Sequence, residues 1–121
     1  NDLKVVTSRF NQSLKVRKLD ELNDNMHLFK HMIHHLDLSY TDIYDISYLI
    51  NMVHDLDLMS NKIVDISALI NMIYNLNLGD NEIVDISALI NMTHGLSVFN
   101  NNIVDISSLK NMTYDLSICY N

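Results

Sequence analysis

Hydrophobic and polar positions follow one another along this chain in a pattern that returns every 20 residues. Residues 63–72 (IVDISALINM) recur unchanged at 83–92, and close variants occupy 43–52 and 103–112. The repeat is regular over residues 36–121, and a degenerate rung, Leu14-x-Val16-x-x-Leu19, precedes it by 22 residues. One such coil cannot bury its own apolar side chains, so the periodicity predicts a solenoid of stacked coils.

The first part of each repeat reads Leu-x-Leu-x-x-Asn, as at Leu56, Leu58 and Asn61. The alternation predicts a short strand whose two leucines point into the core. The Asn is expected to turn the chain off the sheet, because its amide can bond backbone groups of its own coil and of a neighbouring coil. The same Asn recurs at 81, 101 and 121, whereas the earliest regular rung has Thr41 instead.

The second part of each repeat places apolar residues three positions apart, at 63, 66, 69 and 72 in one coil. This spacing is typical of a 3₁₀ or short helical turn with one edge facing inward. Asp65 precedes the turn and is expected to be its N-cap, assisted by Ser67. The predicted fold class is α/β: a solenoid with a parallel concave β-sheet, rungs about 4.8 Å apart, and a convex side of 3₁₀ helices or turns. We predict one domain over 1–121, with 1–35 as degenerate first repeat and N-terminal cap.

The pattern Leu-x-Leu-x-x-Asn-x-Ile resembles the leucine-rich repeats, and the resemblance covers about five repeats. The continuation at 61–72 (NKIVDISALINM) is similar to two subclasses: the phosphatase-regulator-like repeat of intracellular proteins and the bacterial internalin repeat. Membership implies the solenoid fold and a protein-binding role for the concave sheet. The first subclass implies an intracellular adaptor that docks on an enzyme and modulates it, whereas the second implies an extracellular adhesion ligand.

Composition narrows the classes of function. The net charge of −7 argues against a general nucleic-acid binder, because such proteins usually neutralise phosphates. No apolar run reaches the roughly 18–20 residues of a membrane span. A single cysteine, Cys119, cannot form an internal disulfide, which suits a reducing compartment. We therefore expect a cytoplasmic protein without nucleic-acid or membrane partners.

Sixteen Asn and fourteen Ile stand against two Gly and no Pro. This skew is typical of an A+T-rich coding sequence. Together with compact leucine-rich repeats, it resembles a reading frame of a large DNA virus of the avian poxvirus type, in which case the protein acts in the host cytoplasm. An A+T-rich bacterium or protist is the alternative source.

The strand positions that flank the inward leucines vary between repeats, and we expect them to line the concave sheet and bind a partner protein. The residues predicted to bind are Asp37, Tyr40, Asp55, Asp57, Met59, Asn77, Asp80 and Phe99. Acidic groups beside aromatic and Met side chains suit a basic or amphipathic partner segment. The alternative is a structural scaffold in which these residues only keep the sheet soluble.

Two columns of the repeat are expected on the convex side. One column contains Ile50, Ile70 and Ile90 and ends in Lys110. These isoleucines are expected to be half-buried between coils rather than to form an interaction patch. The other column contains His54, Tyr74, His94 and Tyr114.

Three further patterns are expected to carry no chemistry. His27, His31, His34 and His35 are close enough in sequence to suggest a metal site, but the repeat register sends them to solvent without further ligands. Glycosylation motifs begin at Asn11, Asn91 and Asn111, and they matter only in a secreted protein. Cys119 has no base or orienting group in the repeat pattern. We therefore expect no enzyme activity, no metal and no cofactor.

The two ends of the solenoid differ. Residues 1–35 are basic and can cap the first coil, whereas no comparable segment follows the last strand in this sequence. Open ends expose core residues and strand edges. We expect end-to-end pairing into a homodimer through Leu116, Ile118 and Tyr120, unless a cap is missing from the chain.

Overall fold

The computed structural model describes residues 6–7, 12–15, 35–119 and 121, with side chains described from His35 onward. In this part of the chain, seven short strands form one sheet in sequence order. They are β1 (Val6–Thr7), β2 (Gln12–Lys15), β3 (His35–Asp37), β4 (Asp55–Asp57), β5 (Asn75–Asn77), β6 (Gly95–Ser97) and β7 (Leu116–Ser117). Some residues that the sequence analysis singled out lie outside the described residues. They are the histidines at 27, 31 and 34, the glycosylation motif at Asn11, and Tyr120.

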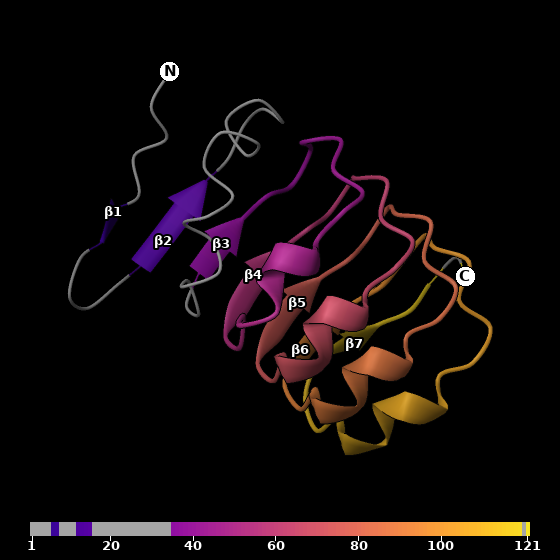
Figure 1. Cartoon of the computed structure of the whole chain (residues 1–121). Helices are drawn as coiled ribbons and strands as arrows, with labels where there is room; N and C mark the ends of the chain where they lie inside the picture. Colours follow the sequence, from indigo (N-terminus) through magenta and orange to yellow (C-terminus); the bar gives the residue numbers. More distant parts are fainter. Residues whose placement is uncertain (1–5, 8–11, 16–34, 120) are drawn as a thin grey trace.

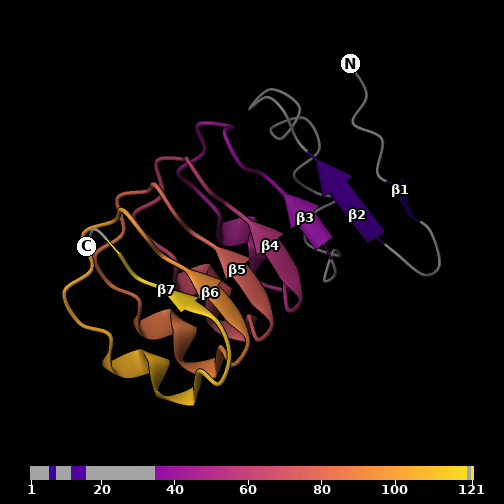
Figure 2. The same ribbon diagram turned by 180° about the vertical axis from the view of Figure 1, so that it is seen from behind.

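The sheet is parallel from β2 to β7, and β1 pairs with β2 in the antiparallel direction. Figures 1 and 2 show the strands side by side, and β3 to β7 each belong to one coil of the stack. The register places Leu14 opposite Leu36, and Leu36 opposite Leu56. The degenerate rung at Leu14 therefore pairs as the repeat pattern predicts, in spite of its longer spacing.

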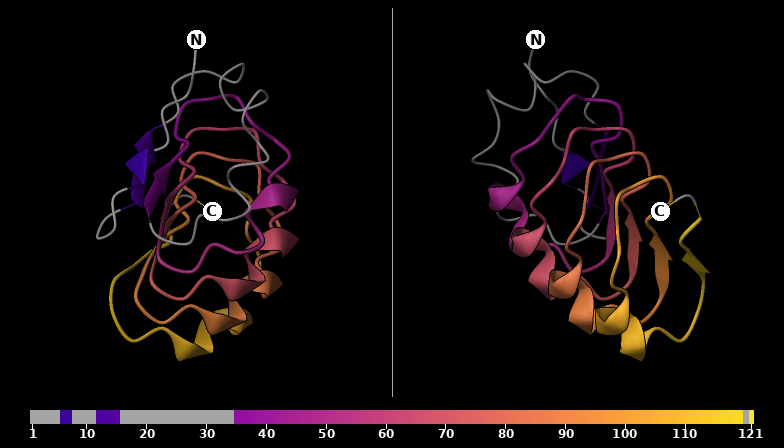
Figure 3. Two further views of the ribbon diagram at one scale, coloured as in Figure 1. Left: turned by 60° about the vertical axis from the view of Figure 1, so that its left-hand side comes forward. Right: turned by 90° about the vertical axis from the view of Figure 1, so that its right-hand side faces the viewer.

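Short 3₁₀ helices lie on the side of the coils opposite the sheet (Figure 3). They are η1 (Ser47–Leu49), η2 (Ser67–Asn71), η3 (Ser87–Asn91) and η4 (Ser107–Asn111). The predicted inward edge is confirmed, since the residues at 63, 66, 69 and 72 are all at most 2% exposed. Together with the inward strand residues, they form one continuous hydrophobic core. The predicted leucine-rich-repeat solenoid is the observed fold. Among the described residues, no helix has the length and apolar character needed to cross a bilayer.

A ladder of buried Asn side chains joins the coils at the end of the strands. The Asn61 amide nitrogen donates to the carbonyl of Leu58 in its own coil at 3.0 Å and to that of Leu38 in the preceding coil at 2.9 Å. Its side-chain oxygen accepts from the backbone N–H of Ile43 at 3.1 Å. Asn81 and Asn101 make the same set of bonds one and two coils later. The predicted role of this Asn is confirmed.

A second ladder of Asn residues runs along the 3₁₀ helices. The side-chain amides of Asn71, Asn91 and Asn111 donate to the carbonyls of Ile50, Ile70 and Ile90 at 2.7, 2.8 and 2.9 Å. Each bond joins one coil to the preceding coil. The amide nitrogens of the two described glycosylation motifs, at positions 91 and 111, are therefore engaged in holding neighbouring coils together.

The prediction that Asp65 is the N-cap of its turn is wrong by one residue. Ile66 occupies that position in η2, and no side chain bonds there. Ile66 must point inward, where it is 2% exposed, so it cannot be replaced by a polar capping residue. The Asp65 carboxylate instead accepts a hydrogen bond from the backbone N–H of Ser67 at 2.9 Å, two residues ahead. This bond lowers the pKa of Asp65, because it stabilises the charged form.

Candidate protein-binding surface

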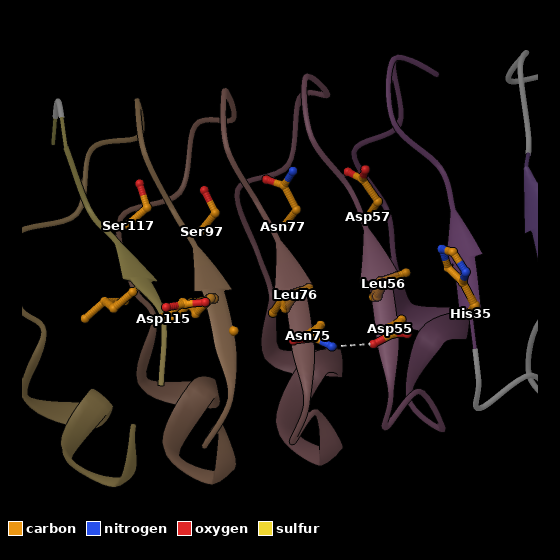
Figure 4. Close-up of a pocket in the computed structure, with 13 residues that line it drawn as sticks. His35, Asp55, Leu56, Asp57, Asn75, Leu76, Asn77, Ser97, Asp115 and Ser117 are labelled. Carbon is orange, nitrogen blue, oxygen red and sulfur yellow. Dashed lines mark hydrogen bonds between the residues drawn. The ribbon is translucent and has the colours of Figure 1, made fainter. Parts of the chain in front are cut away.

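The outward face of the sheet holds a groove of about 490 Å³ that crosses β3 to β7. Figure 4 shows the side chains that line it, in two rows that run from coil to coil. The first row contains His35, Asp55, Asn75, Gly95 and Asp115. The second row within the groove contains Asp57, Asn77, Ser97 and Ser117, and Asp37 occupies the same register position on β3.

The side chains of the first row are charged in some coils and uncharged in others. The Asn75 amide nitrogen donates to the Asp55 carboxylate at 2.8 Å, as Figure 4 shows. The Asn75 side-chain oxygen lies 2.6 Å from where a Cβ on Gly95 would be. Gly95 thus leaves room for the amide, and the row has carboxylates at Asp55 and Asp115 with uncharged groups between them.

Residues of the second row end their strands. The backbone N–H two residues ahead donates to the carboxylate of Asp37 at 3.0 Å, to that of Asp57 at 3.0 Å and to the Asn77 side-chain oxygen at 3.0 Å. These side chains therefore stabilise the turn after the strand as well as facing the groove. The repeat pattern missed this role, although an Asp or Asn two residues before the turn was a usable signal.

Strands β3 to β6 are only three residues long, so the positions beyond them turn away from the groove. Tyr40, Ser60, Asp80 and Asn100 all adopt left-handed backbone conformations, with φ between 53° and 60°. Four predicted binding residues lie in this turn region and do not line the groove: Tyr40, Met59, Asp80 and Phe99. The expectation that their columns lie on the sheet is therefore corrected, because the turn begins right after the second inward leucine.

These turn residues still contact one another and the groove. The Asn77 amide nitrogen lies 3.6 Å from the Met59 sulfur, which places Met59 beside the second row. The Phe99 ring covers Gly79 so closely that a Cβ there would overlap it. Asp80 accepts from the Ser60 hydroxyl at 3.3 Å and from the Asn100 amide. Tyr40 is 66% exposed.

Of the eight predicted binding residues, the groove brings together Asp55, Asp57 and Asn77. It adds His35, Asn75 and Asp115, which were not among the predicted binding residues. The 20-residue register was a sufficient signal for these three, since they share the column of Asp55.

The column His54, Tyr74, His94 and Tyr114 forms a stack of rings directly before the strands. Successive ring centroids lie 4.7, 4.9 and 4.7 Å apart. One ring nitrogen of His94 also lies 2.7 Å from the Thr93 hydroxyl. Sequence reasoning placed these residues in one column and missed the stacking, which contributes to holding successive coils together.

The electrostatic character of this part of the chain is strongly acidic. Residues 35–121 contain eleven Asp or Glu residues against two Lys, a formal charge of −9. Lys62 lies 3.9 Å from Asp42, and both side chains are largely exposed. Within the described ranges, no three His, Cys, Asp or Glu side chains are grouped closely enough to hold a metal ion.

The last strand is the most exposed part of the core. Leu116 is 39% exposed whereas Leu96, one coil earlier, is 3% exposed. Ile118 is 38% exposed whereas Val98, its counterpart, is 0% exposed. Cys119 is a free, exposed cysteine. In the described structure, no further coil covers this edge.

Two solved structures show the relationship of this fold to known proteins. An internalin C2 (inlC2) from Listeria monocytogenes superposes with a TM-score of 0.71 and 27% sequence identity, covering 90% of this chain and 52% of that chain. An internalin (inlF) from the same organism gives 0.66 and 22%, covering 90% of this chain and 34% of that chain. This chain thus spans about half of the first and a third of the second. No protein-family model and no curated protein matches the sequence. The chain is therefore a leucine-rich-repeat solenoid, similar in fold to the internalins.

Proposed function

We propose that this chain is a non-enzymatic protein-interaction module whose concave groove binds a basic or amphipathic segment of a partner protein. The observation that carries the proposal is the groove itself, with Asp55 and Asp57 on β4 and Asp115 directly before β7. A field of one sign along a groove steers an oppositely charged partner and selects against acidic ones.

The shape of the groove suits a short peptide segment. The part of the groove nearer to β7 is lined by Gly95, Ser97 and Ser117, whose small side chains let a partner backbone come close to the sheet. Strands β4 and β7 are three rungs apart, which is about 14 Å at the usual strand spacing. An extended segment of about four or five residues covers this distance, with basic side chains near its two ends.

The test compares three versions of the full chain in affinity capture from the natural source, with captured proteins identified by mass spectrometry. Asp55→Lys with Asp57→Lys reverses the charge of the groove. Asp42→Lys with Glu82→Lys makes the same change in net charge at exposed positions outside the groove lining. We expect the groove variant to lose partners that the wild type and the control retain. Partners shared by all three versions would contradict a groove site.

We further propose that the module is an intracellular adaptor that docks on an enzyme and modulates it, as the phosphatase-regulator resemblance implies. If the source is viral, this adaptor acts on a host protein in the host cytoplasm. The single exposed Cys119 supports a reducing compartment. The second candidate is an extracellular adhesion ligand, and the internalin neighbours favour it. Detection of the natural protein in a cytosolic rather than a surface or secreted fraction separates the two.

A homodimer through β7 is proposed as a separate property. Its support is the exposure of Leu116 and Ile118, whose counterparts in earlier coils are buried. Pairing of two such edges would cover both copies at once. Sedimentation equilibrium should show a dimer that Ile118→Lys converts to a monomer. A wild-type monomer at high micromolar concentration would contradict the proposal.

A further inference from the structure

A second, independent surface lies on the outside of the coils, away from the groove. One apolar side chain per coil is exposed directly after each inward isoleucine at 43, 63, 83 and 103. These side chains are Tyr44, Val64, Val84 and Val104, exposed by 69, 54, 48 and 87%. They form a continuous apolar column on the part of the coil that leads into the 3₁₀ helices, and no described residue covers it.

A row of carboxylates runs beside this apolar column. Asp45, Asp65, Asp85 and Asp105 each accept a hydrogen bond from the backbone N–H two residues ahead, at 3.0, 2.9, 2.8 and 2.9 Å. These bonds lower the pKa of all four carboxyl groups, so the row stays charged at neutral pH. The charges of Asp65 and Asp105 oppose that lowering at Asp85, which shows that neighbouring carboxylates repel one another.

The apolar column and the carboxylates line common hollows. One hollow, of about 390 Å³, lies between two coils and is lined by Tyr44, Asp45, Ile50 and Asp65 among others. A second, of about 320 Å³, is lined by Val84, Asp85, Val104 and Asp105 together with three serines. Each hollow offers apolar walls and carboxylates from two successive coils. This combination suits a Lys or Arg side chain, whose aliphatic stem packs on apolar groups while its charge meets a carboxylate.

The spacing of the hollows selects the conformation of the occupant. They lie two coils apart, which is about 9.6 Å at the strand spacing of about 4.8 Å per coil. Side chains at i and i+7 of an α-helix are about 10.5 Å apart, and one helical turn of about 5.4 Å advances by nearly one coil. Successive side chains on one face of an extended strand are about 6.6 Å apart. This spacing differs from that of the coils, so after two such side chains a bound strand no longer matches them.

We propose that this outer face is a docking surface for a basic amphipathic α-helix that lies along the stack, with about one turn per coil. The exposed apolar column contacts the apolar stripe of the helix, and the carboxylate row pairs with Lys or Arg at i, i+3 or i+4, and i+7. The net charge of −9 over residues 35–121 favours a partner of this sign. This surface is distinct from the concave groove, so either binding proposal can be wrong without affecting the other.

The test uses two synthetic 18-residue peptides of identical composition. In the first, Lys and Leu form adjacent stripes at helical spacing, and in the second the same residues are scrambled so that no stripe forms. Fluorescence anisotropy measures their binding to the full chain. We expect the striped peptide to bind about tenfold more tightly than the scrambled one, because only the first matches the coil spacing.

Matched variants then locate the binding. Asp65→Asn with Asp85→Asn removes two charges but keeps the side-chain oxygens that accept the backbone N–H, so the turns should stay intact. Asp42→Asn with Glu82→Gln removes the same charge at exposed positions that line neither the groove nor the hollows. A third pair, Asp55→Asn with Asp57→Asn, shows whether the peptide binds in the groove instead. We expect the first pair to weaken binding about tenfold and the second to change it less than about twofold. Val84→Ser should weaken binding about threefold, because its apolar contact is lost.

Several outcomes would overturn the proposal. Equal binding of the two peptides would show attraction by net charge alone. An equal or larger loss with the Asp55 and Asp57 pair would move the peptide to the groove. No binding of the striped peptide at millimolar concentration, or no effect of Val84→Ser, would also contradict a surface that combines apolar and charged contacts. Circular dichroism of each variant checks that the fold is retained.

Discussion

The coil before β6 and the coil before β7 have nearly the same sequence, yet their side chains have different environments. Ile86 is 1% exposed and Ile106, at the same repeat position, is 47% exposed. Leu96 and Leu116 differ in the same direction, at 3% and 39%. The local backbone is alike in both coils, since η3 and η4 have matching conformations. At these two positions a residue becomes core only when the next coil covers it, whereas Ile103 and Leu109 are buried within the last coil itself. The stability of each coil therefore depends in part on its neighbour.

The largest expected effect is the difference between two identical substitutions in the interior and last coils. Ile86→Ala should destabilise the protein by about 3–4 kcal/mol, because it removes a fully buried side chain and leaves a cavity. Ile106→Ala should cost less than about 1.5 kcal/mol, because that side chain is already half in water. Chemical denaturation monitored by circular dichroism measures both values. Equal losses of stability in the two variants would contradict this prediction.

The Asn ladder predicts a smaller difference in the same direction. Asn81 is 8% exposed and bonds three backbone carbonyls and one backbone N–H, so Asn81→Ala leaves buried polar groups without partners. We expect a loss of about 2–3 kcal/mol. Asn121 makes the corresponding bonds at an exposed position, so Asn121→Ala should cost about 1 kcal/mol or less because water replaces the bonds. Chemical denaturation measures both variants. A midpoint for Asn81→Ala that is not lower than that for Asn121→Ala would contradict the prediction.

The smallest effect should be similar in the two coils, because its largest cause is a hydrogen bond within one coil. The backbone N–H groups of Ser87 and Ser107 donate to Asp85 and Asp105 and hold the pKa of both carboxyl groups below the ordinary value of an Asp side chain. A carboxyl group whose pKa is lower in the folded state adds stability that is present above the unfolded pKa. That stability is lost as the pH falls through the folded pKa. Asp85→Asn and Asp105→Asn should therefore reduce the acid sensitivity of the melting temperature below pH 4 by similar amounts. A clear difference between the two variants would show that neighbouring coils also control these turns.

Most of the fold could be predicted from the sequence because one repeat unit sets the environment of each column. The inward leucines, the buried Asn61 and the 3₁₀ edge all followed from positions that return every 20 residues. The details of the turns did not follow. Asp65 lies one residue before the N-cap position that was expected for it, and Ser60 adopts a left-handed conformation without glycine. These features depend on local backbone angles, which a pattern of apolar and polar residues does not specify.

The candidate binding surface was predicted less completely for the same reason. Alternation along a strand correctly placed Asp55 and Asp57 on the outer face of the sheet. It could not show that β3 ends at Asp37 and β4 at Asp57, so Tyr40 and Met59 were placed on the sheet although they lie in the turns after these strands. The hollows beside Asp65 were also beyond sequence reasoning, since they arise between coils and need the distances between them.

The most direct test of the central claim adds one coil after Asn121, with the sequence of residues 82–101, and repeats the comparison of Ile86→Ala with Ile106→Ala. If burial is supplied by the next coil, Ile106 becomes core in the extended protein. Ile106→Ala should then cost about 3–4 kcal/mol, the value expected for Ile86→Ala. The extended protein should also be more stable than the original chain. An Ile106→Ala loss that stays below about 1.5 kcal/mol in the extended protein would contradict the account.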